Sequence, residues 1–396
     1  MKRLPLGFRL GGVYCGIKRA TDKLDLSLIV SDRDAVAAGT YTTNLVFAAP
    51  VKWDRARTPN AATRGIVINS GNANACTGTR GDDDCRRMAE LAAAACGAAT
   101  EQMLVLSTGI IGEFLPLAKI EQGIRNCAAQ LGDDEPALIA AACGMLTTDT
   151  RHKVADRTLD VNGTTIRIAG LAKGAAMIGP RMATMLGVVL TDAALQPADA
   201  QRLLAAAVDD TFNCISVDGH MSTNDTVLLL ANGAVGGPPL AGADLDRFER
   251  ELRAVCGELA RAIPADGEGA SHLIRVEVEG CADRAAARAI AKSVSESMLV
   301  KTAVCGADPN WGRIVSAAGY AGVPFDPARV CLWVNDLPLY RDGAPLAFDR
   351  EAASRSIRDH RETRLRLTFG EGSASIVFWT TDLTAEYVHL NADYHT

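Results

Sequence analysis

The stretch RGIVINSGNANACTGTRGDDDCRRMAELAAAACGAATEQMLVLSTGIIG, residues 64–112, decides the fold class of this chain. Two short apolar runs, 64–69 and 102–107, each end at a polar loop that contains glycine. The segment between them begins with acids and continues with an alanine and leucine face, which is typical of a helix. The pattern therefore predicts strand, helix and strand, with a loop after each strand where functional residues gather.

Outward from this passage the mixture of helical and strand patterns continues, and no repeat at a solenoid period is found. The pair Asn162-Gly163 stands between two alternating segments and predicts a β-hairpin. Further helices are expected at about 197–210, 245–262 and 284–297, and further strands over 271–280 and within 364–382. We therefore expect an α+β fold, with layered sheets and helices packed outside them.

The composition is that of an ordinary globular enzyme, with 396 residues, 48% hydrophobic and 22% charged. The net charge of −6 is modest and the charges are interspersed, so no nucleic-acid footprint is indicated. The eleven cysteines are scattered without a CxxC pair, which indicates reduced thiols. The N-terminus has no apolar run of signal length and no window approaches a membrane span, so we expect a cytoplasmic protein with no membrane partner.

The common cofactor motifs are missing from the sequence. It contains no GxxxxGK[ST], no GxGxxG opening a helix after a strand, no HExxH and no GxSxG, and its six histidines are far apart. These findings argue against nucleotide, dinucleotide and zinc chemistry, and we predict neither a metal nor a bound cofactor. Polar clusters rich in Thr, Asn, Asp and Gly remain as the candidate functional loops.

Thr184 lies in one of these clusters, GPRMATMLGVVLTDA (179–193), in the middle of an apolar run. A hydroxyl is a poor nucleophile unless a base takes its proton, and an N-terminal threonine can use its own α-amine as that base. An internal threonine reaches this state when its hydroxyl attacks the preceding carbonyl, here that of Ala183, and water opens the resulting ester. From the residues alone, a half-buried strand threonine is the favoured interpretation, and the nucleophile is the alternative.

Seven separated blocks resemble the ornithine acetyltransferase (glutamate N-acetyltransferase) family, from near Gly7 to Thr396. The resemblance implies an N-terminal-nucleophile-like fold of the ornithine acetyltransferase/DOM type. It also implies self-cleavage between Ala183 and Thr184 into an α-chain, 1–183, and a β-chain, 184–396, that build one active site; we expect a heterotetramer of two α- and two β-chains. The blocks, in chain order, are INSGNANACTG, STGIIG, MLTTDTRHK, KGAAMIGPRMATMLGVVLTDA, TFNCISVDGHMSTNDTVLLLANG, VKTAVCGADPNWGRIVSAAGYAG and YVHLNADYHT.

The reaction that the resemblance implies is the transfer of an acetyl group from N2-acetylornithine to glutamate in arginine biosynthesis. The route is ping-pong, through an acetyl ester on Thr184. Some members of the family also take the acetyl group from acetyl-CoA, so a second, amino-acid N-acetyltransferase activity is an open expectation here.

The resemblance also assigns site residues. Thr184 matches the nucleophile, and Thr108 with Gly109 match the oxyanion hole, where a hydroxyl and a backbone N–H suit a developing negative charge. Lys173 suits an α-carboxylate and Glu268 the cationic end of ornithine. The full set of positions that match substrate contacts is Thr150, Lys173, Thr184, Glu268, Asn391 and Thr396.

The chain departs from the family pattern at three positions: Arg181, three residues before the nucleophile, and the pair His220 and Met221. We interpret His220 as structural and not as a catalytic base, because the α-amine already fills that role. SGNANACTG and GADPNWGR are interpreted as structural loops, and Trp311 as a core residue. Two alternatives stay open: an amidase or aminopeptidase on the same scaffold, and a catalytically silent member of the family.

Overall fold

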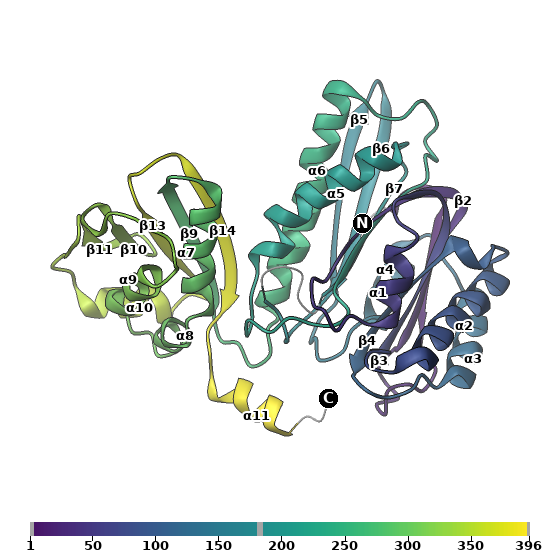
Figure 1. Ribbon diagram of the computed structural model, residues 1–396, viewed down its shortest axis with the longest axis horizontal. Coiled ribbons are helices and arrows are strands. Elements are labelled where there is room, and N and C mark those ends of the chain that lie inside the picture. Colours follow the sequence, from purple (N-terminus) through teal and green to yellow (C-terminus); the bar gives the residue numbers. More distant parts are fainter. Residues whose placement is uncertain (1–3, 180–184, 394–396) are drawn as a thin grey trace. The chain divides into compact units, whose positions relative to one another are not determined.

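The computed structural model describes residues 4–179 and 185–393 of the chain, and it divides them into two compact units. Unit 1 is drawn from Met1–Asn213 and His220–Ile263, and unit 2 from Cys214–Gly219 and Pro264–His395. Each unit has its own sheet, coloured from purple to green in unit 1 and from green to yellow in unit 2 (Figure 1). The helices and strands confirm the expected α+β class.

The sheet of unit 1 has eight strands in the order β4-β3-β2-β8-β7-β6-β5, with β1 paired to β2. Its two parallel pairs are β3 with β4 and β7 with β8, and the other pairs are antiparallel. The strands are β1 (Phe8–Val13), β2 (Leu26–Tyr41), β3 (Asn60–Asn72), β4 (Met103–Ile110), β5 (Lys153–Val161), β6 (Thr164–Lys173), β7 (Leu186–Thr191) and β8 (Thr226–Ala231).

The predicted strand, helix and strand of residues 64–107 are confirmed as β3, α2 and β4. Strand side chains alternate between the two faces of a sheet, and both strands are buried on both faces. Val67 and Val105 pack in one apolar cluster with Met88 of α2. Ile66 and Leu104, one position away, join a second cluster that includes residues of α4 and of β6–β8. Apolar layers on both faces therefore hold the carboxyl ends of β3 and β4 in place.

The helices of unit 1 confirm the predicted segments near residues 82–98, 197–210 and 245–262, and add three short helices that the sequence pattern did not reveal. In Figure 1, α5 and α6 lie along the half of the sheet that contains β6–β8. The helices are α1 (Ala49–Arg55), α2 (Gly78–Cys96), α3 (Leu117–Ala128), α4 (Glu135–Gly144), α5 (Pro197–Asp210) and α6 (Gly242–Ala265), with 3-10 turns η1 (Thr100–Gln102) and η2 (Phe212–Cys214).

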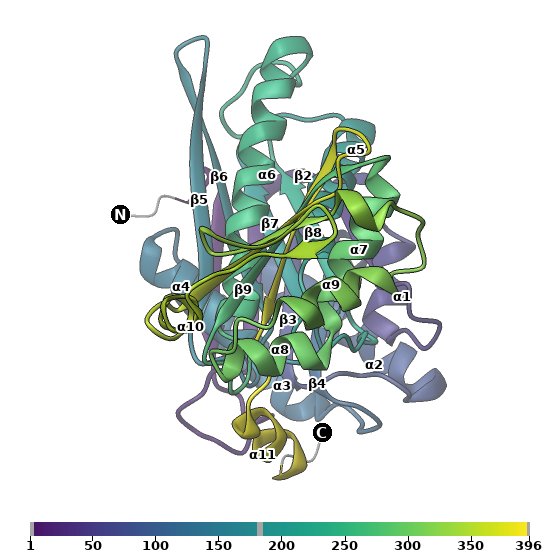
Figure 2. The same cartoon turned by 90° about the vertical axis from the view of Figure 1, so that its left-hand side faces the viewer.

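The hairpin predicted at Asn162-Gly163 is confirmed, since these residues join the antiparallel strands β5 and β6 (Figure 2). Both turn residues have positive φ, 50° at Asn162 and 81° at Gly163. A two-residue hairpin with a type I′ turn requires positive φ at both turn residues. Asn and Gly adopt this conformation most readily.

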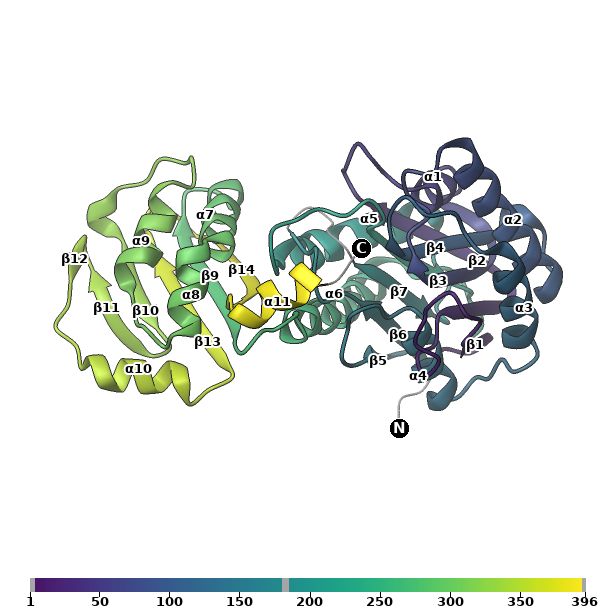
Figure 3. The ribbon, with the colours of Figure 1, turned by 90° about the horizontal axis from the view of Figure 1, so that it is seen from below.

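Unit 2 contains a six-stranded sheet in the order β12-β11-β10-β13-β9-β14, with β9 and β13 parallel. Figure 3 shows α7, α8 and α9 beside this sheet, and Ile290 of α7 and Ile314 of α9 share one core with strand residues. The elements are β9 (Leu273–Cys281), α7 (Arg284–Glu296), α8 (Met298–Cys305), α9 (Trp311–Gly319), η3 (Pro327–Arg329), β10 (Cys331–Val334), β11 (Leu337–Arg341), β12 (Ala344–Pro345), α10 (Arg350–Arg358), β13 (Glu362–Thr368), β14 (Ala374–Thr381) and α11 (Ala385–Asp393).

The two compact units do not divide at the predicted chain boundary of 183 and 184. Strand β6 precedes that boundary and β7 follows it, yet both belong to the sheet of unit 1 and pair with each other. Among the described helices, none is long and apolar enough to cross a membrane.

Candidate active site

The carboxyl ends of the parallel strands β3 and β4 form the centre of the candidate site. Ser70 pairs with Thr108, and Gly71 with Gly109. Gly109 has a φ of 133°, and a Cβ there would lie 2.3 Å from the carbonyl carbon of Gly71 and 2.4 Å from the nitrogen of Asn72. Only glycine allows this close approach of two backbones. The structure therefore explains the glycine that the sequence analysis placed in the oxyanion hole.

Lys173 contacts Thr108 directly. Its Nζ donates a hydrogen bond to Thr108 Oγ1 at 3.2 Å, and the two residues are 2% and 5% exposed. An ammonium group can only donate, so Thr108 Oγ1 is the acceptor and the hydroxyl hydrogen of Thr108 stays available for another acceptor. Two residues predicted for the site, 65 positions apart in the sequence, are thus brought together.

A buried carboxylate lies next to this pair of residues. Asp149 Oδ1 accepts hydrogen bonds from Lys153 Nζ and from the backbone N–H of Gly174, both at 2.7 Å. Burial alone would raise the pKa of Asp149, but the charges of Lys173 and Lys153 and these hydrogen bonds hold it at about 2. Thr150, a predicted substrate contact, is exposed and follows Asp149 in the loop before β5. Asp149 was not among the site residues predicted from the sequence.

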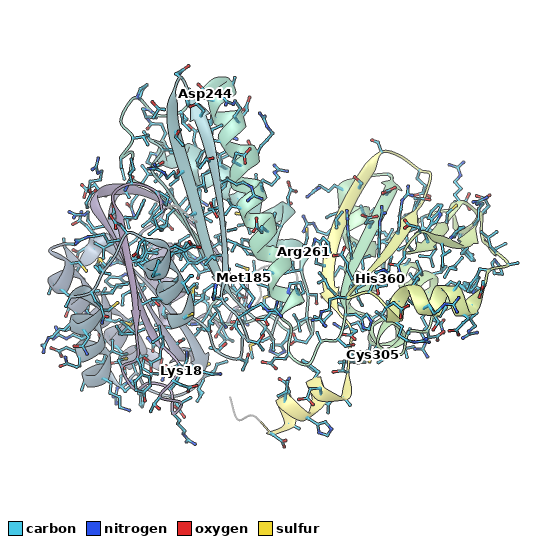
Figure 4. All side chains as sticks on the ribbon, turned by 180° about the vertical axis from the view of Figure 1, so that it is seen from behind. Lys18, Met185, Asp244, Arg261, Cys305 and His360 are labelled. Carbon is cyan, nitrogen blue, oxygen red and sulfur yellow. The ribbon has the colours of Figure 1, made fainter. Side chains whose placement is uncertain are left out.

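A second lysine of unit 1 was also missed. Lys18, labelled in Figure 4, donates through Nζ to the carbonyls of Leu24 at 2.6 Å and Leu146 at 2.7 Å. Burial, with a smaller contribution from the charge of Lys173, lowers its pKa to about 8. Lys18 therefore lies within electrostatic reach of the candidate site. Lys18 lies in an N-terminal loop, and no sequence motif around it indicated a functional residue.

The predicted nucleophile Thr184, its neighbour Ala183 and the departure at Arg181 lie outside the described residues. Met185 is the first described residue after them, and it is labelled in Figure 4. Its N–H donates to Asp225 Oδ1 at 2.9 Å. Burial raises the pKa of Asp225 to about 8, against the lowering effects of the Met185 N–H and of the Lys173 charge.

The asparagines around the site act on the backbone, which confirms the interpretation of SGNANACTG as a structural loop. Asn69 Nδ2 donates to the carbonyl of Asn72 at 2.8 Å, and Asn72 Oδ1 accepts the N–H of Asn74 at 2.8 Å. Asn224 Nδ2 donates to the carbonyls of Ala73 and Ser107 at 2.7 and 2.8 Å. These bonds fix the backbone of residues 72–74, at the end of β3 and in the loop after it, and the carbonyl of Ser107 next to Thr108.

GADPNWGR is also structural. Asn310 caps α9 by accepting the N–H of Arg313, and Trp311 stacks on Tyr340 with 5.3 Å between ring centroids, against the core of unit 2. Trp311 was predicted as a core residue, and it is half-buried and packs against this core from its edge. His220 is exposed in its loop, and Met221 accepts a weak bond from the Thr43 hydroxyl through Sδ at 3.6 Å.

Two further predicted residues meet in unit 2. Asn391 of α11 donates through Nδ2 to Glu268 Oε2 at 2.9 Å. The same helix is held to the Glu268 loop because the Thr384 hydroxyl donates to the carbonyl of Gly269 at 2.7 Å. The described part of the C-terminal segment is therefore docked, as the use of Asn391 requires. Thr396 lies outside the described residues.

A hydroxyl and a glycine N–H at consecutive positions near the end of β4, beside a buried ammonium, are the donors that stabilise an oxyanion in acyl transfer. Fold and site together define an α+β acyl-transfer enzyme. The family model described as "ArgJ family" matches residues 9–396, so the chain belongs to the ArgJ family.

Comparison with known proteins supports the assignment to this family. The "Arginine biosynthesis bifunctional protein ArgJ" of Rhodopirellula baltica is 46% identical over 396 residues, which cover 99% of this chain and 96% of that protein. The protein of the same name from Symbiobacterium thermophilum is 46% identical over 395 residues, covering 99% and 98%. A crystal structure of the arginine biosynthesis bifunctional protein ArgJ of Bacillus halodurans matches with a TM-score of 0.51 and 36% identity, covering 52% of this chain and 98% of that one.

Proposed function

We propose that this chain transfers an acetyl group from N2-acetyl-L-ornithine to L-glutamate, giving L-ornithine and N-acetyl-L-glutamate. The contact between Lys173 Nζ and Thr108 Oγ1 at 3.2 Å is the observation that carries the proposal, because it equips Thr108 to donate to an oxyanion. Membership in the ArgJ family and relatives named as bifunctional proteins of arginine biosynthesis support the choice of substrates.

The acetyl group is stored on Thr184 between two half-reactions. The chain first cuts itself between Ala183 and Thr184, which frees the α-amine of Thr184 to act as a general base for its own hydroxyl. The hydroxyl then attacks the acetyl carbonyl of acetylornithine, ornithine leaves, and glutamate takes the acetyl group from the ester. One pocket holds the two amino acids in turn, so the kinetics are ping-pong.

The groups around Thr108 stabilise both tetrahedral intermediates. The Thr108 hydroxyl and the Gly109 N–H donate to the oxyanion, and removal of one such donor typically costs about 10²- to 10³-fold in rate. The ammonium of Lys173 adds a positive charge in a buried site, where charges act more strongly than in water. The same ammonium suits the α-carboxylate that ornithine and glutamate share.

The remaining predicted contacts complete the proposal. Glu268, held by Asn391, binds the cationic end of ornithine, and Thr150 and Thr396 supply hydroxyls to the substrate. Acetyl-CoA serves as a second acetyl donor, in keeping with the relatives' description as bifunctional. We propose that no bound cofactor takes part, that two α- and two β-chains assemble, and that the reaction takes place in the cytoplasm.

The test uses acetylornithine with an isotopic label in the acetyl group. Without an acceptor, label should remain on a peptide that begins at Thr184, and glutamate should discharge it as N-acetylglutamate. Parallel double-reciprocal lines are expected. Rapid release of free labelled acetate without glutamate would indicate the amidase alternative, which the family membership does not favour. A chain that binds no label and transfers none would refute the proposal.

A further inference from the structure

Lys18 holds one end of a peptide group whose other end is held by Asp149. Lys18 Nζ donates to the carbonyl of Leu146 at 2.7 Å. The N–H of Thr147 donates to Asp149 Oδ2 at 3.1 Å. The carbonyl of Leu146 and the N–H of Thr147 belong to one planar and rigid peptide group. The position of the Lys18 ammonium therefore affects the orientation of the N–H that Asp149 accepts.

Both of these hydrogen bonds involve a charged group, because an ammonium donates to one end of the peptide group and a carboxylate accepts from the other end. Hydrogen bonds with an ionised partner are roughly twice as strong as neutral ones. An ammonium on a carbonyl oxygen also polarises the amide, so its N–H becomes a better donor. Lys18 and Asp149 therefore strengthen each other's contact with the peptide group between them.

Asp149 also fixes the backbone next to Lys173. Its second oxygen, Oδ1, accepts the N–H of Gly174 at 2.7 Å, and this N–H belongs to the peptide group that joins Lys173 to Gly174. Asp149 and Lys173 are 6% and 2% exposed, so water has little access to these bonds. Lys173 Nζ donates in turn to Thr108 Oγ1 at 3.2 Å. A continuous set of contacts thus joins Lys18 to Thr108.

The loop that carries Lys18 is itself fixed beside the strand end next to Gly109. Asp25 is 0% exposed, and its carboxylate accepts the four backbone N–H groups of residues 15–18 at 2.7–3.1 Å. A Cβ at Gly71 would lie 3.1 Å from Lys18 Cγ, and Gly71 pairs with Gly109. The stem of Lys18 therefore lies against the backbone beside the candidate oxyanion hole.

The ammonium of Lys18 binds carbonyl groups and forms no ion pair among the residues that the structure describes. Lys153 provides a comparison, because its ammonium pairs with Asp149 at 2.7 Å and both side chains are buried. The charge of Asp149 is thus balanced without Lys18. The distinct contribution of Lys18 is the orientation of the peptide group 146–147.

We infer that Lys18 is a positioning residue for acetyl transfer, which acts through the peptide group 146–147 and Asp149 on Lys173. This role rests on the proposed function. In this role Lys18 touches neither the substrate nor the reacting atoms. It holds the ammonium of Lys173 in the place where it contacts Thr108 and receives the α-carboxylate. Because ornithine and glutamate share that carboxylate, loss of Lys18 affects both half-reactions.

Lys119 provides a matched control. It lies in α3, and its Nζ donates to the carbonyl of Gly16 at 2.6 Å, in the same loop as Lys18. Lys18→Met and Lys119→Met therefore each remove an ammonium that holds this loop. Only Lys18→Met releases the peptide group 146–147.

The experiment measures kcat/KM for acetylornithine and for glutamate with the full chain, normalised to the cleaved fraction by intact mass. A displacement of about 1 Å can cost about 10²-fold in rate, so Lys18→Met should lower both values by about 10- to 10²-fold. Lys119→Met should stay within about twofold of the wild type. A loss below about fivefold for either substrate with Lys18→Met, or an equal loss in both variants, would overturn the inference.

A double-mutant cycle separates positioning from a general loss of structure. If Lys18 acts through Lys173, its substitution should matter little once the Lys173 ammonium is absent. In the Lys173→Met background, Lys18→Met should therefore slow single-turnover acetyl transfer by less than about threefold. Independent effects would multiply instead, and a full additional loss in this background would overturn the inference.

Lys18→Gln keeps the inference testable if Lys18→Met does not fold. Its amide keeps an N–H donor, but it has no positive charge and its stem is one bond shorter. It should lower kcat/KM for both substrates by about fivefold or more, and a smaller loss would overturn the inference. A wild-type chain that transfers no acetyl group would instead refute the proposed function, whereas wild-type transfer with fully active Lys18 variants would refute the inference alone.

Discussion

Substitution of Thr108 by alanine tests the oxyanion hole. Thr108→Ala removes the hydroxyl that accepts from Lys173 at 3.2 Å and, in our proposal, donates to the oxyanion. Loss of one oxyanion donor should lower kcat by about 10²- to 10³-fold, or about 2.7–4 kcal/mol in the barrier. Loss of a hydrogen bond from a charged donor in a buried site should lower the free energy of unfolding by about 1.5–3 kcal/mol.

The assay measures kcat for acetyl transfer, normalised to the cleaved fraction by intact mass, together with urea unfolding. Ser107→Ala is the matched control, because Ser107 is equally buried on the same strand but donates to Asn69 Oδ1 at 2.6 Å. It should lose stability by about 1 kcal/mol and keep its kcat. Thr108→Ser should restore most of the rate. A Thr108→Ala enzyme with kcat within about threefold of wild type would show that the Thr108 hydroxyl is structural only.

Three further predictions concern other residues. Thr184→Ala should leave a single uncleaved chain by intact mass, whereas the wild-type β-chain should begin TMLGVVL by N-terminal sequencing; a wild-type N-terminus only at Met1 would contradict this. Glu268→Ala should cleave normally and raise the KM for acetylornithine, and an unchanged KM would remove Glu268 from the substrate site. Asp149→Asn leaves Lys153 and Lys173 without their carboxylate, so its free energy of unfolding at pH 7 should fall by about 3–5 kcal/mol. Because the pKa of Asp149 is lowered from 3.8 to about 2, this difference should be fully present above pH 4 and become smaller as the pH falls through 2; a difference that does not change with pH would refute it.

Much of the fold was predictable because its signals are local. Asn162-Gly163 specifies a hairpin through the conformation of two residues, and the acids and alanines before Cys96 specify α2 through helical periodicity. The long strand β2 was missed for a physical reason. Its pairing with β3 shifts register between Val30 and Ala35, and the polar residues 32–34 there are exposed, so no single alternating pattern runs through it.

The site was predictable only where residues match a family motif. Thr108, Gly109 and Lys173 were named through such motifs, and the structure brings Thr108 and Lys173 into contact. Asp149 and Asp225 were missed because their importance depends on burial and on partners in other strands. Asp225 differs from a surface aspartate because strands from other parts of the chain bury it. The local sequence does not show which residues will be buried in this way.

The strand order β2-β8-β7-β6 has a consequence for how such an enzyme can be assembled. The two middle strands belong to the part of the chain after Thr184 and the two outer ones to the part before it. A polypeptide ending at residue 183 would lack β7 and β8, so the edges of β2 and β6 that pair with them would be exposed. Unpaired strand edges promote aggregation. Production of the two halves as separate polypeptides should therefore yield insoluble material. If the chain is cut after residue 183, as we propose, the uncut precursor would have to place β7 and β8 between β2 and β6 before cleavage.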